Sequence, residues 1–159
     1  MAGAQPEDDL FTLMHQIFQD AWSAAPSDFS GLGIILYRPG HALPHAALRE
    51  AVPAELEEAI GANEIARVLS RLAAVRSPWH DGFHFIDASD VRLTHVAQYI
   101  SPPIPPCVEL CSFIGGARHM SAILASRIDG VAMVGVLTSK GEISMYVEGE
   151  RLWHQEEGA

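Results

Sequence analysis

The chain has 159 residues, of which 48% are hydrophobic, and its formal net charge is −10. This length predicts one domain with a sizeable core, and the acidic balance argues against a general nucleic-acid-binding protein, because phosphate contacts need clustered cations. No apolar stretch reaches the roughly 18 residues of a membrane span, and residues 1–10 lack the pattern of a signal peptide. We therefore expect a cytoplasmic domain over 1–159 that does not enter the membrane, with flexible ends at 1–7 and 152–159.

The first half of the chain alternates helical and strand-like patterns. Apolar residues at three- and four-residue spacing predict a helix over 8–23 that buries Leu13, Ile17 and Phe18. The apolar run at 31–37 predicts a buried strand, whereas two prolines and two histidines indicate a loop over 41–53. Helical spacing returns over 54–75, with Gly61 and Asn63 as candidate positions for a break into two helices.

The second half is richer in strands. Strands are predicted over 83–87 and 92–100, joined by a turn at 88–90, and the prolines of 101–106 exclude a helix or a central strand. A helix over 117–127 is followed by predicted strands at 131–137 and 142–147, and the tail from 149 onward is expected to fray. This order predicts an α/β fold with a mixed central sheet flanked by helices.

Three short segments have residue types that could support chemistry. At 79–82, Asp81 could hold a divalent cation or accept a proton, and Gly82 would let a ligand approach the backbone; the alternative is a common Asp-Gly turn. At 115–119, two glycines precede a helix that carries Arg118, which suits phosphate, although a plain loop–helix junction has the same pattern. The third, at 137–141, combines two hydroxyls and a cation in what is otherwise an ordinary hairpin turn.

The cysteines and the other histidines give no metal signature. Cys107 and Cys111 are too few for a zinc site, and two reduced thiols in the cytoplasm are the simpler interpretation. Six further histidines lack metal-binding spacing and are interpreted as surface or hydrogen-bonded interior residues: His15, His41, His45, His84, His95 and His154.

In their order and spacing, four stretches resemble the diadenylate cyclase (DAC, DisA-type) domain family. That family has an HDGA loop, a G-T-R-H-R-A-A helix start and a final S-E-E-x-G-x-I-S turn. The corresponding stretches here are SPWHDGFHFID (77–87), RLTHVAQYISPP (92–103), GGARHMSAILASRIDG (115–130) and LTSKGEISMYVEGE (137–150). The resemblance spans nearly the whole chain, but its specific motifs lie in the second half.

The resemblance implies a nucleotidyltransferase that joins two ATP molecules into cyclic di-AMP and releases two pyrophosphates. Its site forms where two domains face each other, which implies a homodimer or larger homo-oligomer. By this resemblance Asp81 would hold Mg²⁺ or Mn²⁺ and help activate the attacking 3′-hydroxyl, with Gly82 beside the nucleotide. The implied nucleotide contacts are Tyr99, Ile100, Gly116, Arg118, His119, Thr138, Ser139 and Lys140.

Several positions depart from the family pattern. Phe83 stands for the alanine of HDGA, Ala117 for the threonine before R-H, and Met120 for the second arginine. The acidic pair of the final turn is replaced by 138–140. Three functions stay open: a diverged cyclase, a non-catalytic sensor of ATP or cyclic di-AMP, and a structural or interaction domain. In either nucleotide-binding case we expect Asp81 and Arg118 to share one cleft.

Overall fold

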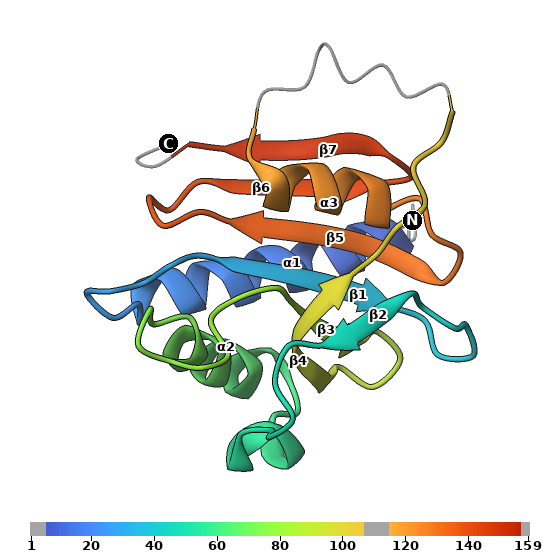
Figure 1. The fold of residues 1–159 in the computed structure, drawn as a ribbon. Helices are drawn as coiled ribbons and strands as arrows, with labels where there is room; N and C mark the ends of the chain where they lie inside the picture. Colours follow the sequence, from blue (N-terminus) through green and yellow to red (C-terminus); the bar gives the residue numbers. More distant parts are fainter. Residues whose placement is uncertain (1–5, 107–114, 157–159) are drawn as a thin grey trace.

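The computed structural model describes residues 6–106 and 115–156, with nothing described of the side chain of Pro6. Cys107 and Cys111 lie outside the described residues. The chain forms a mixed sheet with helices on both faces (Figure 1), which confirms the predicted α/β class. The helices are α1 (Pro6–Ser23), the short 3₁₀ helix η1 (Ala54–Glu58), α2 (Ala62–Leu72) and α3 (Ala117–Ala125).

The sheet of the described chain has seven strands in the order β2-β4-β3-β1-β5-β6-β7. Only β1 and β3 run parallel to each other; every other neighbouring pair in this order is antiparallel. The strands are β1 (Leu32–Tyr37), β2 (His45–Ala47), β3 (Phe83–Asp87), β4 (Arg92–Ile100), β5 (Val131–Leu137), β6 (Ile143–Val147) and β7 (Glu150–Gln155).

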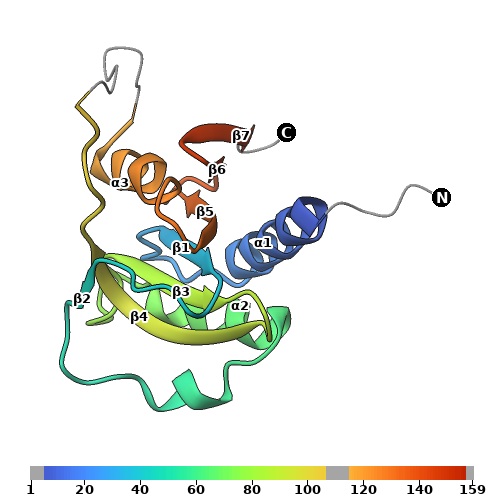
Figure 2. The same cartoon turned by 90° about the vertical axis from the view of Figure 1, so that its right-hand side faces the viewer.

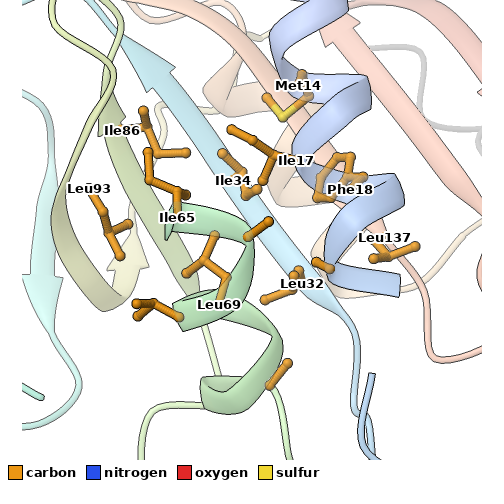
Figure 3. Packing of buried hydrophobic residues seen from close by; sticks show 14 of the residues in the cluster. Met14, Ile17, Phe18, Leu32, Ile34, Ile65, Leu69, Ile86, Leu93 and Leu137 are labelled. Atoms are coloured by element: carbon orange, nitrogen blue, oxygen red, sulfur yellow. The ribbon is translucent and has the colours of Figure 1, made fainter. Parts of the chain in front are cut away.

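Helices α1 and α2 cover one face of the sheet, and α3 lies on the other face (Figure 2). Figure 3 shows the larger core, where Met14, Ile17 and Phe18 of α1 lie beside β1. Ile17 and Phe18 are fully buried as predicted, whereas Leu13 is only partly buried. These apolar residues recur at helical spacing and so form a stripe along one face of α1. The removal of this apolar surface from water drives the packing of α1 on the sheet.

On the opposite face, α3 packs on the sheet through small side chains. Ala122 and Ala125 are buried against a cluster that includes Ile35, Phe83 and Phe85. Gly33 of β1 makes room for the aromatic ring of Phe83, because a Cβ at Gly33 would lie only 2.7 Å from that ring. The bulky residue at 83 therefore fits into the interior of the domain, where its exposure is only 4%.

Most predicted boundaries agree with the structure, and the break predicted near Gly61 is present. Gly61 has a φ of +84° and separates η1 from α2. As expected, residues 101–106 belong to neither a helix nor a strand. Among the helices of the described chain, none has the length and apolar character that crossing a bilayer requires.

Two predictions about irregular segments are wrong. Residues 45–47 of the predicted loop 41–53 form β2, because β4 supplies partners for their backbone groups. The tail does not fray from 149: residues 150–155 form β7 on β6, so 152–155 are not a free end. Trp153 holds this strand against α1, with its ring edge-on to Phe11 and His15. At the other end, Glu7 already belongs to α1.

Candidate functional site

A cavity of about 300 Å³ opens where the start of β3, the end of β4 and the start of α3 meet. This volume lies at the lower end of the usual range for small-molecule sites. Asp81 and Arg118 both line the cavity, which confirms that they share one cleft. The lining residues are Leu48, Asp81, Gly82, Phe83, Gln98, Tyr99, Ile100, Ala117, Arg118 and Ser121.

The backbone at Gly82 requires glycine. Its φ is +78°, and a Cβ there would lie 2.5 Å from the carbonyl oxygen of Gln98 on β4. A side chain at this position would force one strand to shift, because its Cβ would be too close to the Gln98 oxygen. The positive φ is a second obstacle, since residues other than glycine rarely adopt it. Gly82 therefore brings the chain before β3 into close contact with β4, next to the carboxylate of Asp81.

The Asp81 carboxylate lies at the mouth of the cavity, where its side chain is 66% exposed. Its nearest basic neighbour is the Nε2 of His80, at 3.6 Å from Oδ1. The Nδ1 of His80 lies 2.7 Å from the carbonyl oxygen of Ser77, which can only accept a hydrogen bond. Nδ1 of His80 therefore donates to this carbonyl, and Nε2 is the ring nitrogen that faces Asp81.

Arg118, the second residue of α3, extends its guanidinium to Gly31, before β1. A Cβ at Gly31 would lie 2.9 Å from Nη1 of Arg118. Burial lowers the pKa of Arg118 from its ordinary value, and the negative charge of Asp81 opposes that shift. Within the described chain, Arg118 makes no hydrogen bond and no ion pair, so a partly desolvated cation faces the cavity without a bonded acceptor.

The next residue, His119, does not line the cavity. Its Nδ1 is 2.8 Å from the phenolic oxygen of Tyr146 on β6, and burial followed by the nearby His154 lowers its pKa. Consecutive residues of an α-helix point about 100° apart, so Arg118 and His119 face different neighbours. Of the two expected phosphate contacts, Arg118 lines the cavity and His119 does not.

The 138–140 turn lies near Arg118 but does not line the cavity. The Oγ1 of Thr138 accepts hydrogen bonds from the backbone N–H groups of Lys140 and Glu142, at 3.3 and 3.1 Å. The threonine hydroxyl thus stabilises the hairpin turn between β5 and β6. The Ser139 backbone nitrogen lies near Gly31, 3.4 Å from the position of an added Cβ, whereas Lys140 is exposed.

Part of the cavity lining is apolar. Ile100 is buried, and the Tyr99 side chain is 57% exposed at the rim. Gly116, also expected to contact nucleotide, precedes α3 without lining the cavity and provides no side-chain cap to its first-turn amides. Sequence reasoning missed Leu48, Gln98 and Ser121; of these, Ser121 could have been found, since it follows Arg118 by three residues on one helix face.

A buried histidine supports the β4 side of the cavity. Ala97 has a φ of +50° at an irregularity in the pairing of β3 with β4, and its N–H donates to Nδ1 of His84 at 3.2 Å. The carbonyl of Ala97 accepts a hydrogen bond from the Leu48 N–H at 2.9 Å. Burial, then the charge of Arg118, lowers the pKa of His84 to about 3, so this imidazole is neutral.

The cavity offers few of the oxygen ligands that Mg²⁺ or Mn²⁺ needs. No group of three or more His, Cys, Asp or Glu side chains that could hold a metal occurs among the described residues, and Asp81 is the sole carboxylate of the cavity lining. Mg²⁺ is often held by one or two carboxylates together with substrate phosphates and water. Asp81 therefore fits as the protein ligand of a cation that arrives with a nucleotide.

Comparison with protein families and with curated proteins identifies no relative. No protein-family model matches the chain, and no curated protein matches it. The resemblance to diadenylate cyclases thus stays a prediction from the motifs quoted above.

Proposed function

We propose that this chain binds an adenine nucleotide, ATP or cyclic di-AMP, in the cavity beneath α3, as a cytoplasmic nucleotide sensor. Arg118 is the observation that carries the proposal. A partly buried guanidinium without a hydrogen-bonded partner in the described chain is costly, and a phosphate would provide the missing acceptors. The first-turn amides of α3, which lack a side-chain cap, add donors at the same end of the helix.

The apolar side of the cavity suits a nucleobase. Tyr99 offers an exposed ring on which a purine can stack, and Leu48 and Ile100 add apolar surface. Phe83 also lines the cavity, but its ring is buried in the core, where it packs against Gly33. With Phe83 in its lining the cavity still has a volume of about 300 Å³, which is compatible with binding.

The first test is nucleotide affinity in the Arg118→Ala variant. Because Arg118 supplies a charge-assisted contact of about 1.5–3 kcal/mol, we expect roughly 10- to 150-fold weaker binding. Isothermal titration with ATP and with cyclic di-AMP measures this. Arg67→Ala is the matched control, since Arg67 is exposed on α2 and pairs with Glu64. If neither nucleotide binds the wild-type protein at millimolar concentration with Mg²⁺ present, a structural or interaction domain is the better interpretation.

A diverged diadenylate cyclase is the second candidate, favoured by the exposed Asp81 carboxylate beside Arg118. In that case Asp81 would hold Mg²⁺ or Mn²⁺ supplied with ATP, and the cation would neutralise phosphate charge. Asp81 could also accept the proton of the 3′-hydroxyl that attacks the α-phosphorus of a second ATP as pyrophosphate leaves. Two ATP molecules must meet, so this function includes a face-to-face homodimer or larger homo-oligomer.

The cyclase is tested by incubating the protein with ATP and Mg²⁺ or Mn²⁺ and measuring cyclic di-AMP by mass spectrometry. We expect Asp81→Asn to abolish product while ATP still binds, because the amide cannot accept the proton or hold the cation equally well. Product formation by the wild type would establish the enzyme. Nucleotide binding without product would support the sensor.

A further inference from the structure

Two histidines from different strands lie together on the sheet face that also carries α3. His45 of β2 is exposed, and His95 of β4 is partly buried. Their ring centres are 5.1 Å apart with an interplanar angle of 75°, and Phe85 lies beneath both, at 4.9 and 5.5 Å. Their separation of 50 positions in the sequence hides this pair from any search for metal-binding spacing.

Hydrogen bonds determine which nitrogen of His45 carries its proton. The Nδ1 of His45 lies 2.8 Å from Oε1 of Gln98. The amide nitrogen of Gln98 donates to the carbonyl of Val96 at 2.8 Å, so its oxygen is the group that faces the imidazole. Nδ1 of His45 must therefore donate, which leaves an unprotonated Nε2 on the neutral ring.

The same reasoning holds for His95. Its Nδ1 lies 2.9 Å from Oγ1 of Thr94, whose single hydroxyl hydrogen is directed to the carbonyl oxygen of Phe85 at 3.2 Å. Oγ1 therefore accepts from Nδ1 of His95, and also from the hydroxyl of Tyr37 at 3.0 Å.

We propose that His45 and His95 form a binding site for a divalent first-row transition-metal ion such as Zn²⁺, through their two Nε2 atoms. Two imidazoles bound to one tetrahedral zinc at about 2.0–2.1 Å have ring centres roughly 5 Å apart, which matches the observed pair. Histidine ligands normally donate the other ring N–H to a fixed acceptor, as Gln98 and Thr94 provide here. Water completes the coordination, and the ion joins β2 to β4.

Zinc titration of the whole chain tests this site, with Zn²⁺ alone as the probe. His45→Phe and His95→Phe keep an aromatic ring against Phe85 but remove a ligand, so each should weaken the tightest Zn²⁺ binding by about tenfold or more. The matched control is His154→Phe on β7, an exposed strand residue at the opposite edge of the sheet, which should leave the affinity unchanged. Wild-type affinity in His45→Phe, or an equal loss in His154→Phe, would overturn the proposal.

A second measurement does not depend on whether the His95 variant folds. Long-range ¹H–¹⁵N correlation spectra distinguish the two neutral tautomers, and we expect both His45 and His95 to be protonated on Nδ1 without metal. Zn²⁺ should then shift the Nε2 resonances of these two rings first. Protonation of either ring on Nε2, or zinc-induced shifts at other histidines alone, contradicts the site.

Discussion

At the scale of single residues, two basic side chains that are buried or partly buried lack hydrogen-bond partners, among the described residues, for some of their nitrogen atoms. Arg118 lacks a hydrogen-bonded partner within the described chain, and His84 is fully buried with its Nε2 unpaired there. His84 accepts the N–H of Ala97 and so holds a positive-φ residue beside the cavity. Both unpaired groups lie where β3, β4 and α3 converge. A ligand bound there would offset the free-energy cost of leaving them without hydrogen-bond partners.

His84 predicts a specific pH dependence of stability. Its pKa is about 3 in the folded protein against 6.5 for an unperturbed imidazole, so the unfolded chain binds more protons between these values. The stabilisation is complete above pH 6.5 and is lost as the pH falls toward 3, by about 1.4 kcal/mol per pH unit from this residue. His84→Asn keeps an acceptor for Ala97 but cannot titrate, so its unfolding free energy should fall less steeply.

Denaturant unfolding of wild type and His84→Asn across this pH range measures the difference. Because His95 and His119 titrate in both proteins, their contributions cancel in the comparison. Parallel stability curves for the two proteins would show that His84 does not account for the acid sensitivity.

At the scale of elements, the close approach of β3 and β4 shapes the cavity. Gly82 brings the backbone before β3 against the Gln98 carbonyl, and the pairing of β3 with β4 is irregular near Ala97, beside the cavity. The extra residue at such a bulge changes which side chains face the site. The arrangement depends on backbone contacts more than on any one side chain.

Gly82→Ala should therefore destabilise the protein, by about 1–3 kcal/mol, because the new Cβ meets the Gln98 oxygen and the residue keeps a positive φ. Gly116→Ala is the matched control: its φ is −85°, and an added Cβ meets nothing within 4 Å. That change should alter stability by less than about 1 kcal/mol. Thermal unfolding of both variants compares them directly, and equal midpoints would contradict the steric argument.

At the scale of the whole molecule, the two faces of the sheet differ in what packs against them. The face under α1 and α2 carries the larger apolar core, while the face under α3 combines a smaller core with the cavity and the His45–His95 pair (Figures 1 and 2). Because α3 is only nine residues long, it leaves part of that face, over β2 and β4, without a covering helix from the described part of the chain.

The amino-acid sequence by itself determined the α/β class, the helix of 8–23, the break at Gly61 and the strands predicted at 83–87, 92–100, 131–137 and 142–147. Local periodicity and backbone preference carry this information, because each element buries one face of its own residues. Tertiary structure alone decided that residues 45–47 and 150–155 become strands, since their partners β4 and β6 supply the hydrogen bonds. It also decided that Arg118 faces Asp81 while His119 faces Tyr146, and that His45 meets His95. These contacts form between residues that are far apart in the sequence, so local sequence patterns do not predict them.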